Sequence, residues 1–374
     1  MLRSIKTTMQ FKIFCTSVLF LLFFQGKSLA QVKFVNEFLN IGVGARAHAM
    51  SGSVVASVSD GTAGYWNTAA LTELEVPFQI NAMHAEWFGG ISNYDYFSIA
   101  KRLNKEKSSY ASLSFIRLGV DDIPNTLNLI GADGSVNYDK ITNFSASDYA
   151  FFISYATKVD DANKFSIGGN VKIIRRVIGP FAGAWGFGAD LSVSYKLNDN
   201  ITLAASGRDI TTTFNAWSFN LDEASKEVFT ATNNQIPSSS VESTIPRFIL
   251  GSAYKNTFRK FTYLAEIDIN LSTDGRQSGL ISSDNFALDP SLGIEIGYDD
   301  LVFIRGGIGN IQKALDQVNP ELTRTEFQPN IGLGIQLGRV TVDYALANVG
   351  NVSGILASHI FSLKLSFLDR NEKQ

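Results

Sequence analysis

The segment ILASHIFSLKLSFL, residues Ile355–Leu368, alternates apolar and polar side chains over most of its length. One face carries mainly apolar side chains: His359, Phe361, Leu363, Leu365 and Phe367. The other face is more polar: Ile360, Ser362, Lys364 and Ser366. A period of two residues indicates a β-strand with one apolar face. Such a strand fits the wall of a membrane β-barrel, where the apolar face meets lipid, and also a soluble sandwich, where it meets a core.

Segments of this kind recur along the chain after Leu71 and predict about fourteen strands. Many have roughly the nine to eleven residues that a tilted strand needs to cross a bilayer. The predicted strands are Phe78–Trp87, Tyr94–Leu103, Tyr110–Gly119, Ser147–Thr157, Lys164–Val177, Trp185–Leu197, Ile201–Ile210, Ile245–Tyr254, Lys260–Leu271, Pro290–Tyr298, Leu301–Asn310, Phe327–Leu337, Arg339–Asn348 and Ile355–Leu368.

The connections between these strands are of two kinds. Short polar turns alternate with connections that include four long loops, residues 120–146, 211–244, 272–289 and 311–326. Outer-membrane barrels have short periplasmic turns and longer extracellular loops, whereas a soluble sandwich has no reason to sort its loops in this way. The sequence therefore predicts an all-β, transmembrane, antiparallel β-barrel of about 14 strands, covering residues 76–374.

The first thirty residues have the pattern of a secretory signal peptide, which places the mature protein outside the inner membrane. A basic region, an apolar stretch and a small-residue cleavage site follow one another: Arg3, Lys6 and Lys12, then Ile13–Phe24, then Ser28–Ala30. We expect cleavage before Gln31. The single cysteine, Cys15, lies inside this signal, so the mature chain is expected to contain no disulfide and no thiolate metal site.

Composition excludes several classes of protein. Loss of the four basic residues of the signal leaves 28 Lys and Arg against 35 Asp and Glu, a net charge of −7, whereas nucleic-acid binding needs a basic surface. No apolar run of helix-spanning length follows the signal, which argues against a helical membrane protein. An exported chain that is 12% aromatic fits an outer-membrane location.

The segment between the signal and the first strand differs from the rest. Phe38–Leu71, FLNIGVGARAHAMSGSVVASVSDGTAGYWNTAAL, is rich in Gly, Ala and Ser and shows no period of two residues. Small residues allow the backbone to approach other groups closely. We interpret residues 31–75 as a compact plug that lies in the barrel lumen.

Three motifs in this plug resemble the PorV/PorQ family of outer-membrane proteins of the Bacteroidetes type, which are related to FadL-type fatty-acid channels. The motifs are Gly42–Met50 (GVGARAHAM), Ser53–Gly61 (SVVASVSDG) and Tyr65–Leu71 (YWNTAAL). A weaker resemblance covers Gln235–Gly251. The chain departs from the family pattern at four positions, which indicates a divergent member: Ser51, Gly61, Thr68 and Ala70.

The resemblance implies a fourteen-stranded barrel with an N-terminal plug, and a role in type IX protein secretion. It gives structural roles to the plug motif residues Gly44, Arg46, Met50, Asp60, Tyr65, Trp66 and Asn67. In such a plug we expect Arg46 to pair with Asp60, because an unpaired charge in the lumen is costly. We also expect Trp66 to pack the plug against the wall and Asn67 to bond a backbone turn.

Nothing in the sequence predicts an enzyme, a cofactor or a metal site. The three histidines, His48, His84 and His359, are far apart in sequence and belong to no catalytic motif. His84 and His359 lie in the first and last strands, which pair when a barrel closes, but each is better interpreted as a half-buried strand residue. The glycine-rich fragments do not open a helix after a strand, so they do not form nucleotide-binding loops.

The loop 211–244 is the least strand-like part of the barrel region. Residues Asn220–Thr230 are predicted to form a short amphipathic helix, and Trp217, Phe219 and Phe229 are candidate contacts for a protein partner. The alternative is that this loop folds back into the barrel mouth.

Two functions follow from these observations, and a barrel enzyme is a third, weaker alternative. The first is a non-enzymatic component of type IX secretion that binds or shuttles sorting-domain cargo, with other secretion-system proteins, secreted cargo and outer-membrane lipid as partners. The alternative is a FadL-like channel for hydrophobic small molecules, in which Val54, Val55 and Val58 line the path of a ligand in the lumen. An apolar lumen beside the plug favours the channel, and a sealed polar lumen favours secretion.

Overall fold

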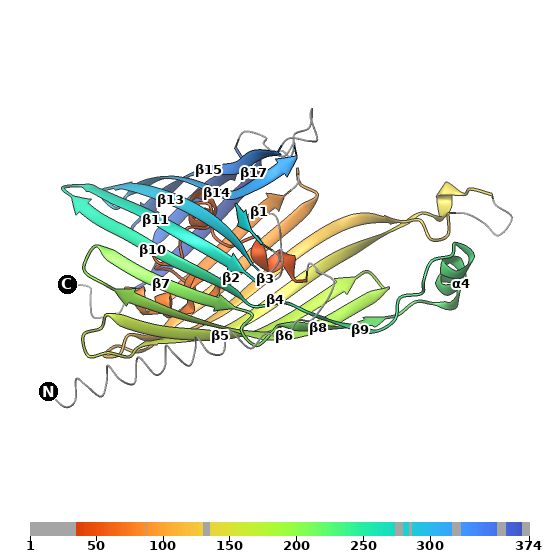
Figure 1. Cartoon of the computed structure of the whole chain (residues 1–374), viewed down its shortest axis with the longest axis horizontal. Coiled ribbons are helices and arrows are strands. Elements are labelled where there is room, and N and C mark those ends of the chain that lie inside the picture. Colours follow the sequence, from red (N-terminus) through yellow and green to blue (C-terminus); the bar gives the residue numbers. More distant parts are fainter. Residues whose placement is uncertain are drawn as a thin grey trace. The chain divides into compact units, whose positions relative to one another are not determined.

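The computed structural model describes residues 35–87, 89–129, 135–273, 280–283, 286–315, 323–349 and 357–368, whose strands form a closed antiparallel sheet (Figure 1). The expected signal peptide lies outside these residues. The first strand, β1 (Phe78–Trp87), pairs with β2 on one side and with the last strand, β17 (Ser358–Phe367), on the other. This pairing joins the two ends of the sheet. The predicted fold class, an antiparallel β-barrel, is confirmed.

In the described part of the chain, seventeen strands occupy fourteen positions in the wall. Strands β7 and β8 share one position, β9 and β10 share another, and β12 is a two-residue strand beside β13. The remaining bounds are β2 Ser92–Asn104, β3 Ser109–Asn125, β4 Thr142–Lys158, β5 Phe165–Ile178, β6 Ala182–Lys196, β7 Ile201–Arg208, β8 Phe214–Phe219, β9 Ser240–Ser243, β10 Arg247–Phe258, β11 Phe261–Ser272, β12 Ile281–Ser282, β13 Ala287–Tyr298, β14 Val302–Leu315, β15 Thr323–Leu337 and β16 Val340–Ala347.

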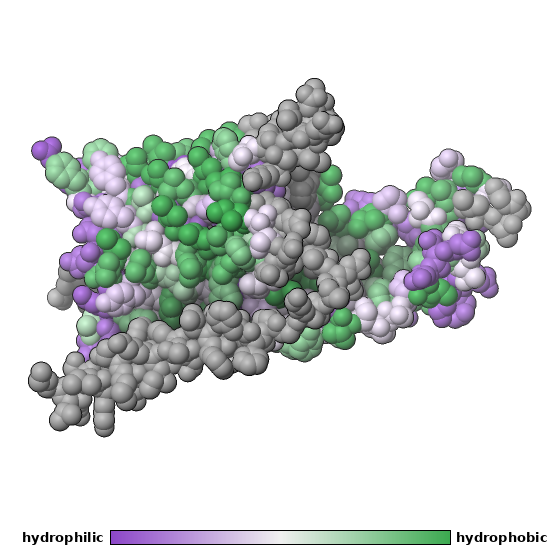
Figure 2. All heavy atoms as spheres, viewed as in Figure 1, coloured by the Kyte–Doolittle hydropathy of each residue, from purple (hydrophilic) through white to green (hydrophobic). Residues whose placement is uncertain are grey.

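A band of large apolar side chains covers the outer face of the barrel, as Figure 2 shows on the visible side. It is formed by outward-facing residues at alternate positions of the wall strands, and its exposed members include Phe97, Leu113, Phe151, Val171, Leu191, Leu203, Leu250, Ile267, Ile294, Ile304, Leu333 and Val342. On β17 the predicted face, Phe361, Leu363, Leu365 and Phe367, points outward as well. A contiguous apolar surface of this extent is incompatible with water and matches the lipid-facing surface of a transmembrane barrel.

Leu333 lies within this band, so we expect Leu333→Arg to destabilise the folded barrel by about 2–4 kcal/mol in a bilayer. Leu337, four residues along the same strand and next to a turn, provides the matched control, because the same change near the interface costs about 0–1 kcal/mol. Urea unfolding in lipid vesicles measures both. Equal costs at the two positions would contradict a membrane-embedded band.

Several strands extend farther than the alternation predicted. Strands β3 and β4 continue to pair out to Asn125 and Thr142, and in Figure 1 they reach beyond the neighbouring strands. Strands β8 and β9 lie inside the segment predicted as the loop 211–244. Outside the bilayer a strand needs no apolar face, so its backbone pairing continues without the side-chain pattern that identifies it in sequence.

Among the described residues outside the plug, helices are few and short. The helix α4 (Glu223–Ala231) closely matches the predicted range 220–230 and begins at Asp222, whose carboxylate accepts a hydrogen bond from the Ser225 N–H at 2.8 Å. A single turn, η3 (Tyr138–Lys140), lies between β3 and β4. Within the described residues, no helix has the length and apolar character needed to span a membrane.

The described part of the plug, from residue 35, forms four short helical turns inside the barrel, drawn in red and orange in Figure 1. They are η1 (Glu37–Asn40), α2 (Ala45–Ala49), α3 (Ala63–Trp66) and η2 (Thr68–Glu73). Helices this short are unstable alone, so their order depends on packing. Val43, Met50 and Val54 have no exposed surface and share one apolar cluster with wall residues such as Tyr94 and Ile116.

Candidate functional site

The plug is held together by its own aromatic and amide side chains. The Trp66 indole N–H donates to the Val43 carbonyl at 2.8 Å, and the Tyr65 hydroxyl donates to the Leu39 carbonyl at 2.5 Å. The Asn67 amide donates to the Val55 carbonyl at 2.7 Å, and its oxygen accepts from a backbone N–H at the start of η2. Trp66 and Asn67 therefore connect segments of the plug that are distant in sequence.

The expected pair of Arg46 and Asp60 does not form. Arg46 Nε instead donates to Glu295 on β13 at 2.8 Å, and Glu295 also accepts from Arg305 on β14 at 2.5 Å. Asp60 accepts a hydrogen bond from the backbone N–H of Thr62 at 2.8 Å, within the same turn of the chain. The prediction failed because a local backbone partner takes Asp60, while a wall carboxylate far away in sequence takes Arg46.

Two buried carboxyl groups of β11 bind the plug backbone. Asp268 Oδ2 accepts hydrogen bonds from the N–H groups of Val54 and Val55 at 3.0 and 3.1 Å, and Glu266 Oε1 accepts from the N–H of Ala56 at 2.6 Å. The valine side chains face the packed interior and have no exposed surface. In this structure Val54 and Val55 thus attach the plug to the wall and do not line an open path.

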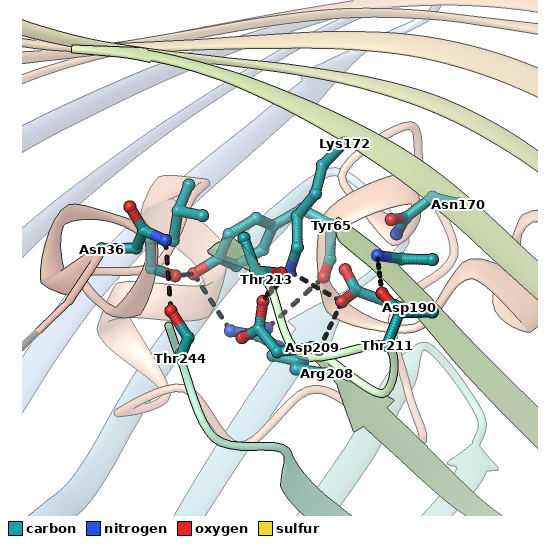
Figure 3. Close-up of polar contacts among 12 residues, drawn as sticks. Asn36, Tyr65, Asn170, Lys172, Asp190, Arg208, Asp209, Thr211, Thr213 and Thr244 are labelled. Carbon is teal, nitrogen blue, oxygen red and sulfur yellow. Dashed lines mark hydrogen bonds and ion pairs between the residues drawn. The ribbon is translucent and has the colours of Figure 1, made fainter. Parts of the chain in front are cut away.

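A second attachment lies where the wall strand is interrupted between β7 and β8 (Figure 3). There the chain carries Asp209 inward, and the ammonium group of Lys172 on β5 lies 2.7 Å from Asp190 on β6 and 2.6 Å from Asp209. The Lys172 side chain is only 3% exposed. The two carboxylates and the ammonium group are buried together. Removing any one of them would leave an uncompensated charge in the lumen, which is energetically costly.

Arg208 connects this cluster to the plug. Its guanidinium lies 4.4 Å from the centre of the Tyr65 ring and 5.2 Å from that of Trp66, and it donates to the Tyr65 hydroxyl at 3.2 Å. Desolvated contacts of a cation with aromatic faces contribute about 2 kcal/mol or more. At the start of the plug, Asn36 donates to the Thr244 hydroxyl at 3.2 Å, as Figure 3 shows.

Glycines of the wall let the plug backbone touch the barrel directly. A Cβ built on Gly168 would lie 2.5 Å from the Ala69 nitrogen, and one on Gly307 would lie 2.4 Å from the Met50 carbonyl carbon. Gly332 would place its Cβ 2.5 Å from that of Ala49. A side chain at any of these positions would overlap the plug, so the glycines are required for close approach.

The plug lies between two chambers of the lumen. The chamber on the long-loop side has a volume of about 550 Å³, and its apolar lining includes Ile41, Trp66, Trp87, Ile249 and Ala347. The chamber on the short-turn side has about 980 Å³ and is rich in charged side chains: Glu73, Glu75, Lys164, Lys196, Lys255, Arg339 and Lys364. We refer to them as the outer and inner chambers.

The wall behind the plug is polar. Buried side chains that face the plug include Gln79, Asn81, Ser98, Ser112, Ser114, Ser154, Asn170, Ser192, Ser194 and Ser206. Several polar wall residues bond the plug directly, as when Ser362 accepts from the Ala45 N–H at 2.7 Å. The lumen therefore combines a polar plug-to-wall contact with an outer chamber that contains indole and aliphatic surface.

The other predicted residues take up varied positions. Gly44 has φ = 91°, which favours glycine, and its N–H points to the Met83 sulfur at 2.9 Å. Trp217 donates to Glu242 at 2.8 Å and stacks on Phe219 with ring centres 6.2 Å apart. Both rings and Phe229 are half-buried.

His84 and His359 form hydrogen bonds with different partners. His84 bonds Asp95 at 2.7 Å and His359 bonds the Tyr344 hydroxyl at 2.8 Å, both on the outer face of the barrel. In the part of the chain that the structure describes, no three or more His, Cys, Asp or Glu residues are grouped to hold a metal ion.

Sequence reasoning missed the charged wall residues that bind the plug, Arg208, Glu266, Asp268 and Glu295, and the charged wall residues that lie beside them, Lys172, Asp190, Asp209 and Arg305. Each is a charged residue within or at the end of a strand. The sequence did contain one signal for these residues, namely a charged side chain at an inward-facing position of a membrane strand. Such a side chain requires a polar partner in the lumen.

We expect His48 to make plug attachment dependent on pH. Burial lowers the pKa of His48 from its usual value near 6.5 to about 4, and its Nε2 lies 3.2 Å from the Gly42 carbonyl. A released plug would bind a proton that the seated plug excludes, so we expect attachment to be strongest above pH 6.5 and to weaken as the pH falls toward 4. Protease cleavage of the plug, measured across this range, should show the change.

His48→Gln should flatten that pH dependence, whereas His84→Gln, on the exposed outer face, should preserve it. If the wild type and His48→Gln lose the plug over the same pH range, His48 is not the titrating group.

Comparison with known proteins identifies the fold. No protein-family model matches the sequence, and no curated protein matches it either. Among solved structures, the monoaromatic hydrocarbon channel CymD has a TM-score of 0.54 at 13% identity, over 88% of this chain and 98% of that chain. The fold is that of a FadL-like barrel.

Two further structures agree. The P. putida toluene transporter TodX has a TM-score of 0.55 at 12% identity, over 88% of this chain and 99% of that chain. A Pseudomonas aeruginosa FadL homologue has a TM-score of 0.50 at 12% identity, over 86% of this chain and 97% of that chain. Because the sequence identities are this low, the similarity establishes the FadL-like barrel fold and nothing beyond the fold.

Proposed function

We propose that this protein is a plugged outer-membrane channel for hydrophobic small molecules. The observation that carries the proposal is the shared fold, over nearly the full length of both chains, with proteins named as a monoaromatic hydrocarbon channel and a toluene transporter. The outer chamber supports it, since its volume of about 550 Å³ is that of a small-molecule site and Trp66, Trp87 and Ile249 give it apolar surface.

In this function the outer chamber receives the ligand and the plug controls its passage. The plug fills the lumen between the chambers, so transfer requires the plug to shift. Its attachments include hydrogen bonds from backbone N–H groups to wall acceptors, such as Asp268 and Ser362. When the plug shifts, water can replace these hydrogen bonds. Each of them therefore contributes only about 0.5–1.5 kcal/mol to the stability of the seated plug. The protein acts by binding and gating, and requires no catalytic residue.

Equilibrium binding of toluene to the purified barrel tests the proposal. We expect saturable binding to the wild type and weaker binding to Ile249→Asn, because a buried apolar contact in the outer chamber is lost. Leu264→Asn is the matched control: Leu264 is also a buried inward residue, but it lines the inner chamber. Absence of saturable binding to any form would reject the channel.

The type IX secretion role, expected from the resemblance to the PorV/PorQ family, is a second candidate function. Its support is the polar, extensively bonded plug-to-wall contact and the projecting segment that carries α4 (Figure 1). Purification in mild detergent from native membranes, followed by mass spectrometry, tests it. Deletion of Glu223–Ala231 should then abolish recovery of a secretion component or sorting-domain cargo. Recovery of the barrel with lipid or hydrocarbon alone would favour the channel.

A further inference from the structure

Six outward-facing side chains form one row across neighbouring strands, away from the plug and both chambers. Direct cross-strand pairs connect them in the order His84, Asp95, Arg117, Tyr149, Arg175 and Trp185. All six occupy the register that carries the lipid-facing side chains of β1 to β6. Charged side chains on the lipid-facing surface of a barrel are costly unless they lie at the membrane interface.

The row marks the outer limit of the apolar band on these strands. On the short-turn side of Arg117 the outward positions are Phe115 and Leu113, and on the same side of Arg175 they are Ile173 and Val171. On the long-loop side the next outward positions are Gly119, Ser147, Val177 and Gly183, and Val177 is the one aliphatic side chain among these four. This pattern places the arginines at the headgroup level of the outer leaflet.

Both guanidinium groups extend away from the apolar band. A Cβ on Gly119 would lie 2.7 Å from Arg117 Nη2, and one on Gly183 would lie 2.7 Å from Arg175 Nη1. Each guanidinium therefore lies over a glycine, one step farther toward the long-loop end than its own Cα. Arginine at a membrane interface directs its charge toward the headgroups in this way.

The contacts of these arginines leave capacity for an anion. Arg117 meets one carboxylate, Asp95, at 3.4 Å and also contacts the Tyr149 side chain, and the other oxygen of Asp95 bonds His84 at 2.7 Å. Arg175 donates to the Ala184 carbonyl at 3.2 Å and lies 5.2 Å from the centre of the Trp185 ring. Each guanidinium has five N–H donors, which is more than these contacts use.

The spacing suits a phosphate between the two arginines. Strands β3 and β5 flank β4, so Arg117 and Arg175 are two strand spacings apart, about 9.6 Å, with Tyr149 between them. A phosphate group in the middle is within reach of both forks and of the Tyr149 hydroxyl. Below it, the Phe115 ring lies 5.0 Å from Phe151 and 6.2 Å from Tyr149, which forms an aromatic surface for acyl chains.

We propose that Arg117, Tyr149 and Arg175 bind the phosphate group of an outer-leaflet membrane lipid, whose acyl chains lie on the aromatic surface beneath them. The cationic groups at the headgroup level and the continuous apolar band below them match the two parts of such a lipid. The site is separate from the lumen and does not depend on what the channel transports.

The test measures lipid binding to the mature protein by native mass spectrometry in detergent, with diphosphorylated lipid A as the probe. We expect Arg117→Gln with Arg175→Gln to weaken binding at least tenfold. Arg259→Gln with Arg339→Gln removes the same charge at exposed positions near the short turns and should leave binding unchanged. The double variant Arg117→Lys with Arg175→Lys keeps both positive charges but loses the bidentate hydrogen-bonding geometry of the guanidinium groups. It should give intermediate affinity.

Two comparisons distinguish recognition of a lipid phosphate from binding through acyl chains alone and from binding of a free anion. Fully dephosphorylated lipid A should bind the wild type as weakly as diphosphorylated lipid A binds the glutamine variant. Equal binding of the two lipids to the wild type would overturn the proposal. Competition by inorganic phosphate alone, at the concentration of the lipid, would also overturn it, because that result identifies a free-anion site.

A folding check keeps these outcomes interpretable. Each variant should retain the heat-dependent shift in gel mobility that is typical of closed barrels. For a variant that loses this shift, Gly183→Leu replaces it, because a leucine there displaces the Arg175 guanidinium without removing a charge. Unchanged lipid affinity in Gly183→Leu would count against the site.

Discussion

Replacing Gly307 with valine is expected to force the plug out of its seat and open the lumen. A Cβ at this position of β14 would lie 2.4 Å from the Met50 carbonyl carbon and 2.7 Å from the Ser51 nitrogen. The backbone of the plug cannot move aside there without losing neighbouring contacts, and overpacking of this kind costs about 1–3 kcal/mol. Conductance of single proteins in planar bilayers should rise from a closed level to a stable open level.

Gly306→Val is the matched control, because Gly306 belongs to the outward register of the same strand and its Cβ would meet only the Asn330 carbonyl oxygen, at 3.9 Å. It should conduct like the wild type. Protease cleavage of the plug should increase in the Gly307 variant alone. A closed channel with a protected plug in Gly307→Val would show that the plug and wall do not touch as described.

Replacing Lys172 with methionine is expected to give the largest loss of stability. The ammonium group is buried between Asp190 and Asp209, so its removal leaves two carboxylates in the lumen with Arg208 as a nearby cation. Removing one partner from a buried ionic cluster typically costs about 3–5 kcal/mol. The midpoint of urea unfolding in lipid vesicles should decrease accordingly.

The double change Lys172→Met with Asp190→Asn provides the control, because Asp209 and Arg208 then balance each other. It should recover part of the lost stability. If the double variant is as unstable as the single one, packing of the lysine stem and not charge imbalance accounts for the loss.

The wall strands were predictable because their constraint is local. Membrane strands must alternate between lipid and lumen, and that rule is visible in any short segment, as in Phe78–Trp87, whose predicted bounds match β1. The extra length of β3 and β4 was not predictable in the same way, because strands beyond the bilayer are free of that rule.

The plug contacts depended on information that a single sequence does not contain. Arg46 and Glu295 are 249 positions apart, and choosing Glu295 among the inward acids requires the final register of β13. Asp60 was the nearer candidate, but its carboxylate is taken by a turn only two residues away. Local patterns therefore predicted the barrel and the presence of the plug, while the partners of its charges emerged from the three-dimensional arrangement.

The distribution of the plug contacts along the chain has a consequence for assembly. The plug precedes every strand in sequence, yet Val54, Val55 and Ala56 bond to β11, and Met50 lies against Gly307 on β14. These contacts do not exist until the C-terminal half of the wall has formed. A nascent chain must therefore keep its first segment unseated until late in insertion. A completed lumen then becomes the template on which that segment folds, and a truncated barrel has no place for it.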